Sequence, residues 1–163
     1  MTIDTGVNVV LVYDDNNKQY IQTYPLRENE KLNALMSNLN SDSEFYWRWV
    51  SSSMWVYSNK KQEIEYATVD GPAPLNMITL HQGWNLLTIT PQMSGKTLND
   101  IKGNCDIKKS YAWWAERQTW DLIDLNDAPF SNSLLGLGII VKVSENCRLG
   151  TSESAIVPPQ IPN

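Results

Sequence analysis

Apolar and polar residues alternate over short stretches of this chain, a pattern typical of a protein built mainly from strands. The β-branched run 7–13 has no helical periodicity, and residues 14–17 (Asp-Asp-Asn-Asn) supply a turn. Residues 19–24 alternate again, and Pro25 follows them. The start of the chain therefore predicts a β-hairpin.

The rest of the first half predicts one short helix and several strands. Apolar residues recur at helical spacing within 28–39, and acidic residues occupy the first turn of that segment. The aromatic-rich segments 45–50 and 55–57 are expected to be strands joined by a serine turn. Further strands are expected at 64–69 and 77–80, on either side of a Gly-Pro loop.

The second half predicts a similar series of elements. A strand at 84–90 is followed by a short helix at 97–102, with Thr97 as its N-cap. Segments 109–113 and 120–124 form a hairpin, and 138–143 forms the final strand.

Three landmarks recur in the same order in the two halves. Residues 6–10 (Gly-Val-Asn-Val-Val) match 83–87 (Gly-Trp-Asn-Leu-Leu), and the Leu-Asn pair at 32–33 matches the pair at 98–99. The clusters Tyr-Trp-Arg-Trp and Tyr-Ala-Trp-Trp each begin nine residues before another tryptophan. A repeat of this length is typical of a duplicated small domain rather than of a solenoid.

These elements predict an α+β, sheet-dominated fold of two β-α-β-β-β pseudo-repeats. A lone unit of about 75 residues has a marginal core, so we expect the two to pack around a shared core. The expected parts are residues 1–80 (first pseudo-repeat, with an inserted hairpin), 81–150 (second pseudo-repeat) and 151–163 (proline-rich tail or linker).

Composition narrows the function classes. The chain has 163 residues and a formal net charge of −5, and neither half has the positive excess that nucleic acids or anionic bilayers attract. Apolar runs fall short of the ~20 residues of a membrane span, and no charged-then-apolar leader opens the chain. Seven Trp and seven Tyr against two Phe favour a surface that makes contacts.

The two cysteines lie at the ends of predicted elements in the second half. In an oxidising compartment Cys105 and Cys147 would close a disulfide loop, worth about 3–4 kcal/mol in the chain-entropy model. Two free thiols are the alternative, and they would be typical of a reducing compartment.

A family resemblance enters at this point. Residues 81–89 (His-Gln-Gly-Trp-Asn-Leu-Leu-Thr-Ile) and 95–101 (Gly-Lys-Thr-Leu-Asn-Asp-Ile) resemble a module of secreted and cell-surface proteins from archaea and uncultured prokaryotes. In that module a Gly-Trp-Asn-Leu strand precedes a short helix, an aromatic hairpin and a glycine-led last strand, which 111–113, Trp120 and 136–143 match. The resemblance implies an extracellular, non-catalytic role, and the first half departs from it with Val7 in place of the tryptophan.

Catalytic motifs are weak in this chain. His81 is the only histidine, no Gly-x-Ser-x-Gly elbow is present, and Gly95-Lys96-Thr97 lacks the upstream glycine of a phosphate loop. Two cysteines and one distant histidine do not complete a tetrahedral metal site. We therefore expect no enzyme activity, no metal and no cofactor. The alternative is a hydrolase with paired carboxylates, either Glu63 with Glu65 or Asp121 with Asp124.

The aromatic segments hold the best candidates for a binding surface, because such rings pack on sugars and form protein-contact hot spots. Alternation along 45–50 would place Trp47 and Trp49 on one strand face and Arg48 on the other. In the second hairpin, Trp114 falls on the face opposite Trp113, next to a turn that contains Arg117. The candidate ligand-binding residues are Trp114, Trp49, Trp47, Arg48 and Arg117, with burial against the other half as the alternative for Trp114.

Together these features predict a non-catalytic extracellular or cell-surface module for adhesion or for recognition of a glycan or a protein. The main alternative is a self-assembling subunit of a pilus-like filament, surface layer or virion, since strand edges and the segment 156–162 can pair with a neighbouring copy. The expected partners are thus a glycan or protein at a cell surface, or copies of the chain itself. Nucleic acid and direct membrane insertion are not expected.

Overall fold

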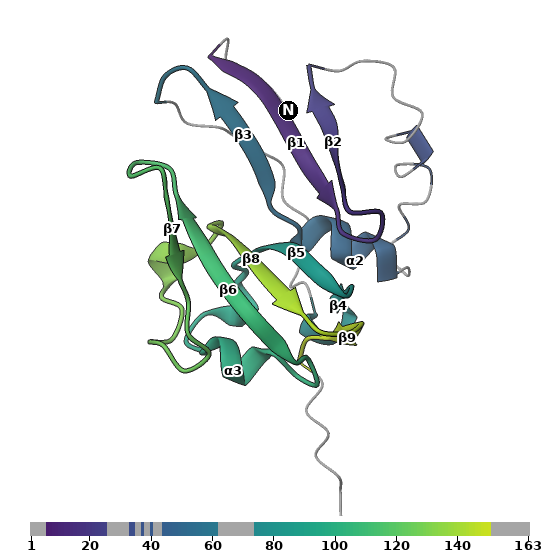
Figure 1. The fold of residues 1–163 in the computed structure, drawn as a ribbon, viewed down its shortest axis with the longest axis vertical. Coiled ribbons are helices and arrows are strands. Elements are labelled where there is room, and N and C mark those ends of the chain that lie inside the picture. Colours follow the sequence, from purple (N-terminus) through teal and green to yellow (C-terminus); the bar gives the residue numbers. More distant parts are fainter. Residues whose placement is uncertain are drawn as a thin grey trace, which may run out of the picture.

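Strands dominate the architecture. The computed structural model describes residues 6–25, 33–34, 37, 40, 44–61 and 74–150, and over these residues the strands form antiparallel sheets accompanied by short helices. Figure 1 shows the sheet of the first half above that of the second, with helix α2 where the two halves meet. The expected α+β, sheet-dominated class is confirmed.

The first half forms a three-stranded sheet in the order β2-β1-β3. Its elements are β1 (Val7–Asp14), β2 (Gln19–Tyr24), α2 (Glu44–Ser51) and β3 (Met54–Ser58). The predicted hairpin is present: the Asp14 carboxylate accepts hydrogen bonds from the backbone amides of Asn16 and Asn17, and Lys18 closes the turn at φ 52°.

Helix α2 corrects the predicted strand 45–50. The segment is aromatic-rich, which favours strands, but it is helical, and its last residue donates a hydrogen bond from Ser51 Oγ to the carbonyl of Trp47. Arg48 and Trp49 line the same cavity. Neighbouring residues of a strand point to opposite faces, whereas on a helix they are about 100° apart, so only the helix allows this arrangement.

Three sequence predictions fall wholly or mostly on residues that the structure does not describe. In the predicted helix 28–39 only Asn33, Ala34 and Ser37 are described, and all three are helical. The predicted strand 64–69 and the tail 151–163 lie outside the described residues.

The second half forms a four-stranded sheet, order β5-β8-β6-β7, and a small pair of strands, β4 and β9. The predicted strand 77–80 is only partly a strand, because Leu75–Met77 is a 3-10 turn. Helix α3 has the predicted N-cap, Thr97, in a reciprocal capping box with Asp100. The elements are β4 (Thr79–Leu80), β5 (Gly83–Thr88), α3 (Leu98–Ile101), β6 (Ile107–Trp114), β7 (Thr119–Leu122), β8 (Gly138–Val143) and β9 (Cys147–Arg148), with further 3-10 turns at Pro91–Met93 and Asn132–Leu134.

The hydrophobic core belongs to the second half. The buried cluster is built from residues between Ile78 and Leu149, including Ile89, Met93 and Val141. The buried side chains of the first sheet, such as Val10, are outside it. Among the described residues the expected shared core is therefore not found, and Ile78 and Leu80 pack with the second half.

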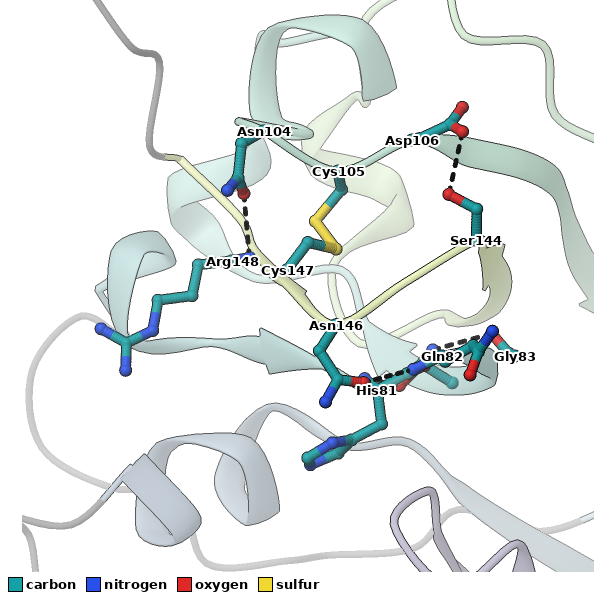
Figure 2. The surroundings of a disulfide bond; sticks show 11 residues. His81, Gln82, Gly83, Asn104, Cys105, Asp106, Ser144, Asn146, Cys147 and Arg148 are labelled. Atoms are coloured by element: carbon teal, nitrogen blue, oxygen red, sulfur yellow. Dashed lines mark hydrogen bonds between the residues drawn. A yellow bond between two sulfur atoms is a disulfide. The ribbon is translucent and has the colours of Figure 1, made fainter.

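The predicted disulfide is present and fixes the end of the second half (Figure 2). It joins Cys105, in the loop after α3, to Cys147 in β9. Asparagine side chains support the same region, since Asn104 Oδ1 accepts from the Arg148 amide and Asn146 Oδ1 from the Gln82 amide. The loop before β6, the joint between β4 and β5, and β9 are thereby held together.

Candidate functional site

Arg48, a predicted ligand-binding residue, is engaged inside the protein. Its Nε lies 3.4 Å from Oδ1 of Asp15 in the β1–β2 turn, and its Nη1 contacts Nε2 of His81. A guanidinium only donates, so Nε2 of His81 is the acceptor. Only 18% of the Arg48 side chain is exposed. The three residues join the first hairpin, α2 and the joint before β5.

Asp15 carries most of the electrostatic cost in this cluster. Burial raises the pKa of its carboxyl above the ordinary value, although the positive charges of Arg48 and Lys18 favour the ionised form. Arg48 therefore compensates an internal charge.

The cavity beside this cluster is too small for an organic ligand. It is lined by Tyr13, Arg48, Trp49 and Leu86, among others, and its volume is about 20 Å³. That is room for roughly one water molecule, whereas sites for small molecules measure about 300–1,000 Å³. The half-buried Trp49 thus packs at the junction of the two halves.

The remaining candidates lie at two separate places. Trp47 is half-buried on α2, with its ring edge-on to Tyr46 at 5.1 Å between centroids. Trp114 is half-buried at the tip of the second hairpin, and the Arg117 guanidinium lies 5.4 Å from its ring centroid. Arg117 also forms an ion pair with Asp121. The structure therefore does not bring the predicted candidates together into one site.

A different aromatic surface lies on the outer face of the four-stranded sheet. Residues paired across neighbouring strands share a face, so the register places Trp113 with Trp120, and Tyr111 with Leu122. The opposite face carries buried residues such as Asn85 and Val141 and covers the core. We call the outer surface, together with its neighbours on β3, the aromatic strip. It consists of Trp84, Tyr111, Trp113, Trp120, Trp55 and Tyr57.

Ring contacts divide the aromatic strip into two groups, Trp84 with Tyr111, and Trp113 and Trp120 with the β3 rings. Tyr111 and Trp113 lie two residues apart on the same face of β6 and bring the two groups side by side. Ring centroids are 6.1 Å apart for Trp84 and Tyr111, and 5.1 Å apart for Trp113 and Trp120. Trp55, from β3 of the first sheet, stacks on Trp120 with centroids 5.8 Å apart and planes 19° apart. Trp55 also lies 5.1 Å from Trp113.

The aromatic strip is open to solvent at its centre and at its far end. Trp120 is 41% exposed and Tyr57 51%, and the other members are half-buried. Buried aromatic side chains normally belong to a core. Large rings that line up in contact and stay accessible are instead typical of surfaces that bind something.

Sequence reasoning missed the aromatic strip for an identifiable reason. Alternation correctly separated Trp114 from Trp113, but it does not say which face covers the core. One local signal was available: Trp113 and Trp120 are each one residue further out than the pair that flanks the four-residue turn 115–118, and such a hairpin pairs them directly. The contribution of Trp55 depends on how the two sheets meet, which no local pattern reports.

The paired carboxylates are placed as follows. Asp121 forms an ion pair with Arg117, and Asp124 Oδ1 accepts a long hydrogen bond from the Asn126 amide. Glu63 and Glu65 lie outside the described residues.

In the part of the chain that the structure describes, His, Cys, Asp and Glu side chains do not gather into a group that would hold a metal ion. None of the helices described there is long and apolar enough to cross a membrane.

Comparisons of the chain with protein-family models, with curated proteins and with solved structures give no match.

Proposed function

We propose that this protein is a non-catalytic binding module, secreted or displayed at a cell surface, that recognises a glycan through the aromatic strip. The observation that carries the proposal is the row of partly exposed rings from Trp84 to Tyr57, in two contact groups that meet at Tyr111 and Trp113 on one face of β6. Indole and phenol rings offer apolar faces to the C–H groups of a sugar, while their N–H and O–H groups remain free to hydrogen-bond its hydroxyls.

The ring geometry favours a ligand that lies along the strip. The nearly parallel pair Trp55 and Trp120, 5.8 Å apart, is within the range of direct ring–ring contact, so no sugar ring fits between them. Trp84 and Trp120 stand on the two outermost strands of the sheet, about three strand spacings or ~14 Å apart across it, and about four residues or ~13 Å apart along the strands. An oligosaccharide spans that distance, and a monosaccharide does not.

The disulfide supports the proposed setting. Cys105 and Cys147 are both buried and bonded, and disulfides persist in oxidising compartments such as the cell exterior. The resemblance of the second half to a module of secreted and surface proteins points to the same compartment.

Replacing Trp120 tests the proposal. We expect Trp120→Ala to weaken binding to an array of immobilised oligosaccharides by about thirtyfold, the loss typical of a hot-spot aromatic. The melting temperature should fall modestly, because Trp120 stacks on Trp55 of the first sheet but is 41% exposed, so binding is measured well below the unfolding transition. Tyr20→Ala is the matched control, since Tyr20 is 55% exposed but lies on β2, outside the strip.

Two results would contradict the proposal: no oligosaccharide retained by the intact protein, or equal retention by Trp120→Ala. Sedimentation velocity examines the self-assembly alternative on the same material. That alternative draws on β3, an edge strand whose Met54, Val56 and Tyr57 are exposed. Growth into large oligomers without glycan binding would favour assembly.

A further inference from the structure

Two lysines lie side by side at the Trp84 end of the aromatic strip. Lys109 on β6 and Lys142 on β8 are direct partners in the sheet register, and Lys142 is also the direct partner of Trp84 on β5. All three therefore project from the same outer face as the strip. The Lys142 ammonium lies 5.7 Å from the Trp84 ring centroid, which ties the charged pair to the aromatic surface.

This pairing of like charges costs stability. Cross-strand partners of the same sign repel each other, and opposite charges would be favourable at these positions. Among the described residues no carboxylate lies within 4 Å of either ammonium, whereas the adjacent Lys108 is paired with Asp106 at 2.6 Å. The chain has 18 acidic and 13 basic side chains, so carboxylates are not scarce. Within the described part of this acidic protein, the exposed Lys109–Lys142 pair is thus a positive spot without a carboxylate partner.

The surface near the lysines also indicates on which side of the pair a negative group of the ligand would lie. A shallow depression of about 280 Å³ lies between β6 and the end of β7, lined by Lys109, Leu122 and Asp124, among others. Asp124 would repel an anion placed there. The most favourable position for a negative group is therefore on the Lys142 side, above the Trp84 end of the strip.

We propose that the glycan is an acidic oligosaccharide whose negative groups are bound by Lys109 and Lys142, while neighbouring sugar rings stack from Tyr111 to Trp120. This inference rests on the proposed function and specifies its ligand. Lysine is a compact point charge that does not impose the planar, two-pronged geometry of arginine. It therefore accepts a carboxylate or a sulfate, and the shared chemistry is an anionic group on a sugar ring.

The test compares glycans that differ only in charge. Polygalacturonate carries one carboxylate per sugar, and its fully methyl-esterified form carries none. Dextran sulfate and dextran form the corresponding sulfate pair. We expect the protein to bind at least one charged member about tenfold or more tightly than its neutral partner, and the difference should shrink as salt rises from 20 to 500 mM.

Variants locate the effect on the lysines. The double variant Lys109→Gln/Lys142→Gln should lose the preference for the charged glycan and keep neutral binding, with unchanged or higher thermal stability because the repulsion is removed. Lys108→Gln is the control, since it removes one positive charge nearby from a pair that is already neutralised. Trp120→Ala should weaken binding to charged and neutral glycans alike.

The outcomes separate the two proposals. Equal binding of charged and neutral glycans, or a preference that survives in the double lysine variant, overturns the acidic-glycan inference and leaves the glycan-binding function standing. Failure of the intact protein to bind any of the four polymers overturns the acidic-glycan inference, and failure to retain any oligosaccharide of the array as well overturns both.

Discussion

The buried ion pair of Asp15 and Arg48 shows how single residues connect the two halves. Burial raises the pKa of Asp15, which means that the folded protein holds a proton on this carboxyl more tightly than the unfolded chain does. The protonated Asp15 carboxyl thus contributes to the free energy of unfolding. This contribution is complete below the ordinary pKa of an aspartate, near 4, and is lost as pH rises through the elevated pKa of the folded state. At neutral pH the ionised carboxylate is therefore a cost that Arg48 limits.

Removing Arg48 should expose that cost. We expect Arg48→Met to lower the free energy of unfolding by about 3 kcal/mol at pH 7, because it leaves a carboxylate that is 9% exposed without its guanidinium. The deficit relative to the unsubstituted protein should shrink as pH falls and Asp15 becomes protonated. Urea denaturation at pH 7 and pH 4.5 measures both effects.

Asp15→Asn is the matched variant for this pair. It removes the buried charge and should cost less than Arg48→Met, and the double variant Asp15→Asn/Arg48→Met should be more stable than Arg48→Met alone. A deficit for Arg48→Met that is the same at both pH values would show that lost packing, and not the Asp15 charge, is responsible.

Residue-level prediction from the sequence succeeded where the signal was local. The disulfide partners Cys105 and Cys147 lie at predicted element ends, and Thr97 caps α3 with the help of Asp100, three residues away. The sequence predicts Arg48 as a ligand-binding residue on a strand, whereas in the structure it contacts Asp15 and His81, each 33 residues away in sequence. Contacts of that kind depend on how elements pack, and a sequence pattern does not report them.

At the level of elements, α3 and β8 are predicted from local sequence signals, whereas α2 is not. The predicted final strand 138–143 coincides with β8, because alternation and a leading glycine are local features. The segment of α2 has strand propensity and folds as a helix, and its Arg48 contacts both the β1–β2 turn and the joint before β5. Tertiary contacts override propensity there.

The disulfide joins β9 to the loop before β6, and we expect its removal to lower the stability of the protein. Cys105 and Cys147 are 42 residues apart, so the bond is expected to contribute about 4 kcal/mol by restricting the unfolded chain. Cys105→Ala/Cys147→Ala should lower the free energy of unfolding by about that amount in urea denaturation. A reducing agent should have the same effect on the unsubstituted protein and none on the variant.

Backbone hydrogen bonds next to β9 determine how much stability remains when the disulfide is removed. Leu149 and Gly150 donate backbone hydrogen bonds to Ile78 and Ile101, so β9 retains anchors after the bond is removed. Equal stability of the oxidised and reduced protein would mean that these anchors suffice to hold β9 without the disulfide.

For the whole molecule, the expected pseudo-repeat is not confirmed. The sequence matches equate β1 with β5, but β1 is the central strand of its sheet and β5 is an edge strand. A closer parallel links β1–β2–β3 with β6–β7–β8, because in each set a hairpin's first strand also pairs with a later strand on its other side. Matching letters could not reveal this, since sheet order is decided by pairing between distant strands.

The unequal distribution of buried residues leads to a last prediction, for the molecule as a whole. The described core lies within the second half, and the first sheet meets it through the aromatic strip, the Asp15–Arg48–His81 cluster and the approach of Ser53 to Gly138. We therefore expect the halves to open separately, with native-state hydrogen exchange at Val10 in β1 reporting a smaller opening free energy than at Val141 in β8.

Gly138→Ala sharpens the test, because the added methyl would lie 3.1 Å from Cβ of Ser53 and force the two halves apart at this contact. It should accelerate exchange at Val10 more than at Val141, and equal acceleration at both would show that the two sheets unfold as one cooperative unit.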